Sequence, residues 1–195
     1  MPTDNPFDAV ADTDLMLRVQ WGSEPAFAEL YRRYYRKLLD FFYGMSGNVQ
    51  RAEDLCHETF LRIWLLRVRY TVTGPFAAYL FAVARHIWLE GQREARKTWR
   101  LGLVRFLDRE EADQAVSRDP APDELAHRLE IDAQVLSALG TLPEEQRMAF
   151  VLRTIEGLSL EDIAAIMRCP INTVRSRRLL AIHRLREALR GLLVL

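Results

Sequence analysis

Apolar side chains recur at steps of three and four residues along most of the chain, which is the spacing that places them on one face of an α-helix. Strand-like alternation of apolar and polar residues is absent, and glycine and proline residues fall between the periodic segments. The pattern therefore predicts an all-α fold. We expect a short first helix over residues 14–20, then helices over residues 24–43, 49–67 and 76–97.

Helix-start signals refine these boundaries. Ser23 precedes a helix with Pro25 in its first turn, and residues 44–48 are expected to close that helix. Further along, a helix over residues 145–156 follows a Thr-Leu-Pro-Glu start, and Ser159 with Asp162 has the spacing of a capping box. The helix that Ser159 opens is predicted to run to about residue 167. A break over residues 168–170 then leads to a last long helix, which Asn172 or Thr173 is predicted to cap.

The stretch over residues 101–125 changes character. It is acidic and contains Asp-Pro-Ala-Pro at residues 119–122, where proline disfavours a helical conformation in the residue before it. We interpret it as a linker. The predicted organisation is two small helical domains, residues 1–100 and 131–195, joined by a flexible acidic linker over residues 101–130.

The last two predicted helices have the layout of a helix-turn-helix, in which a basic second helix enters the major groove. On a helical wheel, one stripe of the final helix is apolar and is predicted to pack on the preceding helix at Leu160, Ile163, Ala164 and Met167; the stripe comprises Val174, Ala181, Ile182, Leu185 and Leu189. Polar side chains on the outer face include Arg175 and Ser176, which suit base and phosphate contacts. Arg178 falls nearer the packed side, where a phosphate or Asp162 is an expected partner.

Formal net charge is zero, but the charges are grouped in blocks. Residues 61–100 carry eight basic against two acidic side chains, and residues 171–195 carry six against one. The block between them, residues 101–135, carries four basic against nine acidic side chains. Because salt screens charges beyond about 8–10 Å, each block acts locally. Two basic blocks therefore indicate contacts with nucleic acid.

The amino-terminal half has two unusual surfaces. Asp54, Glu58 and Arg62 lie at four-residue steps on the helix over residues 49–67. They form either a solvated face with a Glu58–Arg62 pair or an acidic docking face for a basic partner. Residues 67–100 mix basic and aromatic side chains, which suits stacking on unpaired bases, although most of the aromatic residues are expected in the core. Tyr70 and His86 are the residues expected to be exposed.

Several function classes are not indicated. The sequence has no phosphate-binding glycine loop, no nucleophile-elbow motif and no His-Glu metal motif, so we expect no enzyme activity, no cofactor, no metal and no small-molecule substrate. No secretory signal and no run of about 18 apolar residues is found, so we expect a cytoplasmic protein without membrane insertion. Cys56 is interpreted as a small buried apolar residue, and a redox role for Cys56 or Cys169 stays open.

Two segments resemble a known family. LPEEQRMAFVLRTIEGLSLEDIAAIMRCPINTVRSRRLLAIHRLREAL is similar to region four of the extracytoplasmic-function sigma factors, and FAELYRRYYRKLLDFFYGMSGNVQRAEDLCHETFLRIWLLR together with GPFAAYLFAVARHIWLEGQR is similar to region two. The resemblance covers about residues 14–97 and 137–190. It implies a factor that binds core RNA polymerase and directs initiation at promoters.

The resemblance also implies site residues and partners. Upstream, minus-thirty-five promoter contacts would come from Asn172, Thr173, Arg175, Ser176, Arg177, Arg178 and Leu179. Melting and recognition of the minus-ten element would involve Arg69, Tyr70, Phe76, Tyr79, Arg85, His86 and Arg93. A coiled coil of the polymerase would be bound by Asp54, Leu55, Glu58, Phe60 and Trp64. The implied partners are core RNA polymerase, promoter DNA and an anti-sigma factor.

Two other functions share parts of this pattern. A repressor or activator would use the helix-turn-helix alone and would carry a sensing domain at the amino end. A sigma-like adaptor would share the helices without initiating transcription. The order of two separate motifs favours the sigma factor over both alternatives.

Overall fold

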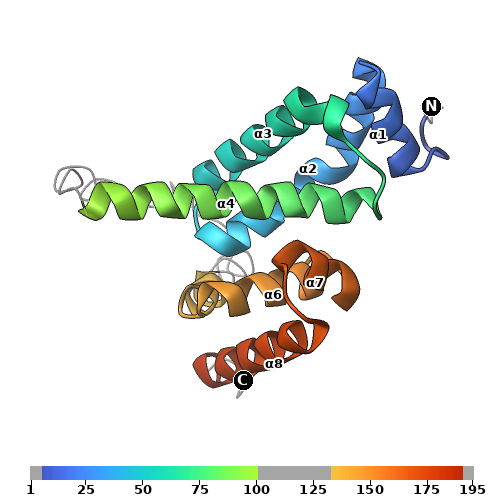
Figure 1. Ribbon diagram of the computed structural model, residues 1–195. Coiled ribbons are helices and arrows are strands. Elements are labelled where there is room, and N and C mark those ends of the chain that lie inside the picture. The colour runs from blue at the N-terminus through green and yellow to red at the C-terminus, as the bar shows by residue number, and fades with distance from the viewer. Residues whose placement is uncertain (1–5, 101–132, 191–195) are drawn as a thin grey trace, which may run out of the picture.

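The computed structural model describes residues 6–100 and 133–190, with the side chains of residues 95–100 excepted, and the described part is helical (Figure 1). The helices are α1 (Asp12–Gln20), α2 (Glu24–Ser46), α3 (Val49–Leu66), α4 (Phe76–Arg100), α6 (Glu144–Thr154), α7 (Leu160–Met167) and α8 (Ile171–Ala188), with a short 3-10 helix η1 (Arg67–Arg69). Residues 133–140 are also helical. The all-α prediction is confirmed. The predicted linker, residues 101–130, lies outside the described residues.

Local signals start the helices where the sequence predicts. The Ser23 hydroxyl accepts a hydrogen bond from the Ala26 backbone N–H at 3.4 Å, and Ser159 accepts one from the Asp162 N–H at 3.0 Å. The Asp162 carboxylate also accepts the Ser159 hydroxyl at 2.6 Å. A Glu at this position would reach the backbone N–H of the cap residue. The shorter Asp bonds the cap hydroxyl instead, so the capping box is modified.

Two helix ends differ from the prediction. Helix α2 passes through Gly44 and continues to Ser46, because Gly47 takes the left-handed conformation (φ 69°) that ends a helix, and its N–H bonds the Tyr43 carbonyl. Helix α8 begins at Ile171, with no side-chain cap. The Pro170 carbonyl accepts hydrogen bonds from the N–H groups of Thr173 and Val174, so the turn forms ahead of the predicted caps.

Helices α1–α4 form an amino-terminal bundle in which α2 packs against both α1 and α3, and α3 packs against α4. Its core contains Leu30, Leu38, Phe41, Phe42 and other fully buried apolar side chains. Helices α6–α8 and residues 133–140 form a carboxyl-terminal bundle. Figure 1 shows this second bundle below the long helix α4, with α3 above it.

The two bundles pack directly on each other, α6 on α2 and α7 on α4. One continuous cluster of buried apolar residues therefore runs from the amino-terminal bundle into α6, α7 and the start of α8. The prediction of two helical units is confirmed. Their contact was not predicted, because it joins side chains far apart in sequence, such as Trp88 and Glu144, separated by 56 positions, and Met45 and Arg147, separated by 102.

Candidate nucleic-acid and protein interfaces

Helix α8 presents a polar face to solvent at its amino end. Val174 is fully buried and anchors this end, while Asn172, Arg175, Ser176 and Leu179 are exposed. The turn before α8 is tight, with Arg168 in the left-handed conformation (φ 50°) and Pro170 directly ahead of the helix. The arrangement is that of a helix-turn-helix whose second helix exposes one face of its first two turns toward solvent, where a major groove could be contacted.

The far end of α8 packs differently from the prediction. Ala181 and Leu185 are buried against Ala138, Leu139 and Leu142, which precede α6. The apolar stripe is therefore confirmed as an inward face, but only its first part lies in the cluster that contains α7. Sequence periodicity identifies which face is buried and does not identify the neighbour.

The arginines of α8 fall into two groups. Arg175 is exposed and donates to the Asn172 side-chain oxygen at 3.3 Å, a weak contact that a base or phosphate could replace. Arg177 is half-buried and forms an ion pair with Glu145 at 2.9 Å. The Nε atom of Arg178 is buried without a hydrogen-bond partner among the described residues, and Asp162 bonds Ser159 rather than Arg178. No ion pair joins Arg178 to Asp162 among the described residues, so of its two expected partners the phosphate stays a prediction.

Helix α3 presents an acidic edge next to an apolar groove. Asp54 is exposed, and Leu55 and Glu58 are half-buried. Glu58 forms the predicted pair with Arg62 at 2.7 Å, and Arg62 also donates to Glu90 of α4. The pair thus belongs to a network that ties α3 to α4.

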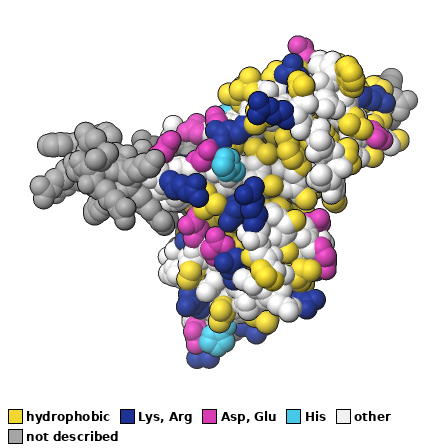
Figure 2. All heavy atoms as spheres, viewed as in Figure 1, with side chains coloured by type: hydrophobic (Ala, Val, Ile, Leu, Met, Phe, Trp, Pro, Cys, Tyr) yellow, Lys and Arg dark blue, Asp and Glu magenta, His cyan; other side chains and the backbone are white. Residues whose placement is uncertain are grey.

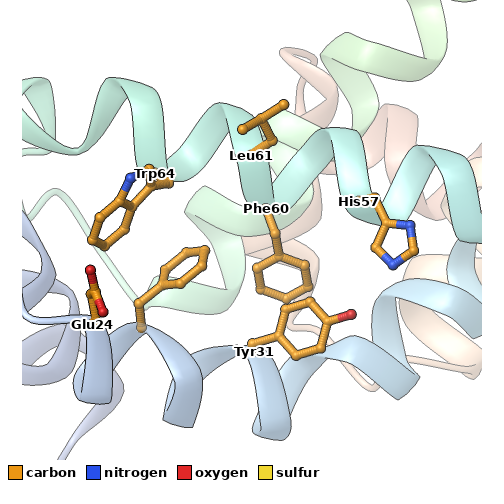
Figure 3. Close-up of a pocket in the computed structure, with 7 residues that line it drawn as sticks. Glu24, Tyr31, His57, Phe60, Leu61 and Trp64 are labelled. Atoms are coloured by element: carbon orange, nitrogen blue, oxygen red, sulfur yellow. The ribbon is translucent and has the colours of Figure 1, made fainter.

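An open groove of about 460 Å³ lies between α2 and α3. Aromatic rings form most of its wall: Phe27 lies 5.0 Å from Trp64, and Tyr31 lies 4.6 Å from Phe60, between ring centroids. Figure 3 shows Tyr31 and Phe60 close together in the middle of the groove, Glu24 and Trp64 at one end and His57 at the other. Leu61, 53% exposed, lies on its rim. Such a groove suits an apolar side chain on a partner helix.

The groove adds residues that the sequence did not single out for binding. Phe27 and Tyr31 lie on the apolar stripe of α2 and were not among the residues predicted to bind a partner. Their stripe is wider than the bundle can cover, and both rings remain partly exposed. The width of this aromatic stripe is the feature of the sequence from which an exposed apolar surface could have been predicted.

The residues predicted to act on the downstream promoter element are not all at the surface. Arg69 and Arg93 are exposed, and the His86 side chain is 61% exposed, 3.0 Å from Glu90. Tyr70 and Phe76, by contrast, are 4% and 2% exposed. The expectation that Tyr70 is exposed is therefore wrong.

The loop after η1 folds back onto the bundle, which explains the burial of Tyr70. The Gln20 side chain of α1 donates to the carbonyls of Val68 and Tyr70 at 3.1 Å each. The Tyr70 ring then meets the half-buried Tyr79 ring edge-on at 4.9 Å. Contacts made by a residue 50 positions away cannot be predicted from the local pattern around Tyr70.

Arg85 of α4 lies at the contact between the bundles. Its side chain is 17% exposed and lies 3.6 Å from Glu145 of α6. Figure 2 shows Lys and Arg side chains mixed with Asp and Glu side chains where the two bundles meet. Of the predicted downstream residues, Arg69, His86 and Arg93 are thus accessible in this conformation, Tyr79 is partly so, and Arg85 is engaged by an acidic side chain.

Neither a metal site nor a membrane span emerges from residues 6–100 and 133–190. No cluster of three or more His, Cys, Asp or Glu side chains there could hold a metal ion. None of the helices in these ranges is long and apolar enough to cross a membrane. Cys56 is buried, and its burial, followed by the nearby Glu53 and Asp40 carboxylates, raises the pKa of its thiol to about 12.

Comparison with known proteins assigns both bundles. The Sigma-70 region 2 family matches residues 30–100, and the Sigma-70 region 4 family matches residues 132–189. RNA polymerase sigma-H factor of Pseudomonas aeruginosa is 33% identical over 183 residues, covering 91% of each chain. ECF RNA polymerase sigma factor SigE of Mycolicibacterium smegmatis is 35% identical and covers 98% of this chain and 70% of its own.

Solved structures share the fold. The sigma factor RpoE of Bartonella quintana, in complex with the anti-sigma factor NepR, matches with a TM-score of 0.62 and 26% identity, over 83% of this chain and 97% of that one. CnrH, in complex with the cytosolic domain of CnrY, matches with a TM-score of 0.68 and 24% identity, over 92% of this chain and 97% of that one. A regulator with a helix-turn-helix alone would match region 4 only. The chain therefore belongs to the ECF sigma factors, which are non-enzymatic factors that bind core RNA polymerase and direct transcription initiation.

Proposed function

We propose that the two bundles recognise different elements of the promoter. Residues 1–100 bind core polymerase and act on the minus-ten element, and residues 131–195 bind the minus-thirty-five element, with residues 101–130 as the connection. The main support for this division is the exposed face of α8: Val174 is buried, whereas Arg175 and Ser176 are exposed beside a tight turn.

The polymerase-binding surface is proposed to be the acidic edge and groove of α3. Exposed Asp54 and half-buried Glu58 supply negative charge for a basic partner, and half-buried Leu55 and Trp64 supply the apolar contact. Phe60, also predicted to bind polymerase, is only 3% exposed and supports the groove from inside. Buried anchors with charged rims are the usual composition of a tight protein interface. As a partner of core polymerase, the protein is expected to act in the cytoplasm.

The downstream element is proposed to meet the exposed cations of the amino-terminal bundle, Arg69, His86 and Arg93. Cations position the phosphates of a separated strand, and partly exposed rings such as Tyr79 stack on unpaired bases. Tyr70 and Phe76 support the loop from inside rather than contact DNA. An anti-sigma factor is proposed as a further partner, because the matching RpoE of Bartonella quintana was solved in complex with the anti-sigma factor NepR.

Matched substitutions test the polymerase surface. Asp54→Ala and Trp64→Ala should each weaken binding to purified core polymerase by about tenfold or more, as expected for anchors of an interface. Glu53→Ala is the control, because Glu53 is an exposed acid on the same helix. Equal binding by all three variants would contradict the proposed docking surface.

A second pair of substitutions tests the proposed DNA contacts of helix α8. Arg175→Ala should weaken binding of the polymerase–sigma complex to promoter DNA by about 1–3 kcal/mol. Arg184→Ala is the control, because Arg184 is exposed on α8 but nine residues further on, on the opposite side of the helix. If Arg184→Ala weakens sequence-specific binding as much as Arg175→Ala, α8 does not read the element through the proposed face.

A further inference from the structure

Helix α1 lies beside the loop that joins η1 to α4, residues 70–75, which we call the η1–α4 loop (Figure 1). The side-chain amide nitrogen of Gln20, the last residue of α1, donates to the Val68 and Tyr70 carbonyls at 3.1 Å each. Because a carbonyl oxygen only accepts hydrogen bonds, the two contacts use both N–H groups of the amide. Gln20 therefore holds the backbone where the loop begins.

The start of α1 is linked to the other end of the same loop. The Tyr34 hydroxyl of α2 donates to the Asp12 carboxylate of α1 at 2.5 Å. The Tyr34 ring meets the Phe76 ring edge-on, with 5.2 Å between ring centroids. Phe76 is the first residue of α4 and is buried. Tyr34 thus connects the first turn of α1 to the residue at which the loop ends.

The loop itself has few contacts that could fix its conformation. Residues 71–75 are exposed, and residues 71–74 form no hydrogen bond with any other residue that the structure describes. The residues on either side, Tyr70 and Phe76, are buried. The conformation of the loop therefore depends on how its two ends are held.

Helix α1 is well suited to hold them, because it is firmly packed on the bundle. Its apolar face is fully buried and comprises Leu15, Met16 and Val19. Arg33 of α2 forms an ion pair with Asp12 at 2.6 Å and donates to the Val10 carbonyl at 2.9 Å. A helix of this length spans about 12 Å, at about 1.5 Å per residue, so its two ends are held at a fixed separation.

We propose that Gln20 is a positioning residue for promoter opening. Together with Tyr34, it holds both ends of the η1–α4 loop in the conformation in which the loop and the adjacent Arg69 contact the separated strand. The proposal rests on the assignment of the downstream element to the amino-terminal bundle, and it adds a residue that acts without touching DNA. A loop that is ordered beforehand loses less conformational entropy on binding than one that must be ordered by the DNA.

Substitution of Gln20 by a neutral side chain tests this role. Gln20→Met removes the donor and keeps a side chain of similar length that favours a helix. Because two neutral hydrogen bonds to the loop are lost, opening of the downstream element should decrease about tenfold. Gln134→Met is the matched control, because Gln134 is exposed in the carboxyl-terminal bundle, and it should open the promoter as the wild type does.

A second substitution tests the other end of the loop and does not depend on the folding of the first variant. Tyr34→Phe removes the hydroxyl that bonds Asp12 and keeps the ring that contacts Phe76, so it should also decrease opening. Tyr43→Phe is the matched control, because Tyr43 lies on the same helix and its hydroxyl forms no hydrogen bond with another described residue.

Opening would be measured with the complex of core polymerase and the full chain, on a promoter identified by run-off transcription. A 2-aminopurine base in the downstream element reports opening, because its fluorescence rises when it unstacks. Transcription would also be measured on a template whose downstream element is mismatched. Because mismatched bases cost less to unstack, Gln20→Met and Tyr34→Phe should transcribe this template within about twofold of the wild type.

Unchanged opening of the paired promoter by Gln20→Met would overturn the positioning role. An equal loss on the paired and mismatched templates would also overturn it, because a smaller amount of folded protein lowers both in proportion. Arg69→Ala and His86→Ala test the underlying assignment separately. If both variants open the paired promoter as the wild type does, the proposed function of this surface is wrong, and the role of Gln20 is wrong with it.

Discussion

Glu156 is the side chain whose ionisation the structure penalises most clearly. It lies just after α6, it is largely shielded from solvent, and its Oε1 atom has no hydrogen-bond partner among the described residues. Burial, followed by the Asp40 carboxylate of α2, raises its pKa from 4.5 to about 8, against an opposing effect of Lys37. Asp40 and Lys37 belong to the other bundle, so the penalty arises at the contact between the bundles.

The sign and size of the effect follow from linkage. Because the folded pKa lies above the unfolded one, the folded state holds the proton more tightly, and stability falls as pH rises from about 4.5 to about 8. At pH 7 this pKa shift corresponds to a loss of about 3 kcal/mol in the free energy of unfolding. Because part of the side chain is exposed, solvent screening reduces the expected loss to about 2 kcal/mol. Glu156→Gln mimics the protonated form and should escape this penalty.

Urea unfolding of wild type and Glu156→Gln at pH 5, 7 and 8.5 provides the assay. The two proteins should be about equally stable at pH 5, and the variant should be more stable by about 2–3 kcal/mol at pH 8.5. Glu161→Gln, at an exposed position of α7, is the control and should show no such pH-dependent gain. If the difference in unfolding free energy between the two proteins is the same at every pH, or if the wild type is the more stable protein at pH 8.5, ionisation of Glu156 does not destabilise the fold.

Three further predictions follow from single contacts. Ser159→Ala should lower the free energy of unfolding by about 1 kcal/mol, measured in urea, because it removes the cap of α7; a neutral effect would contradict that role. In the folded protein, iodoacetamide at pH 8 should modify Cys169 much faster than Cys56, whose pKa is raised to about 12 by burial, and equal rates would show that Cys56 is accessible. Tyr70→Phe should leave run-off transcription unchanged, because the buried hydroxyl has no hydrogen-bond partner among the described residues; a large loss would restore a role for it in DNA contact.

Features set by neighbouring residues could be predicted from the sequence. The caps at Ser23 and Ser159, the buried stripe of α8 and the Glu58–Arg62 pair all depend on residues within a few positions of each other. The start of α8 is the exception among local features. The fixed φ of Pro170 began the helix ahead of the polar residues that usually serve as caps.

Features set by distant residues could not be predicted. Gln20 holds the loop that buries Tyr70, and Glu145 meets both Arg85 and Arg177 across the contact between the bundles. A basic or aromatic residue type indicates nucleic-acid chemistry, but its exposure depends on which helix packs over it. The sequence pattern therefore identified the kind of site more reliably than the members of the site.

Run-off transcription shows directly whether the protein directs initiation through the proposed surfaces. Purified core RNA polymerase would be incubated with fragmented genomic DNA of the source organism, with and without the protein. We expect new transcripts with defined start sites that depend on the protein, are lost with Asp54→Ala or Arg175→Ala, and persist with Glu53→Ala and Arg184→Ala. Transcripts that persist in Asp54→Ala and Arg175→Ala would contradict the proposed surfaces, and a complete absence of new transcripts together with no binding to core polymerase would contradict the account as a whole.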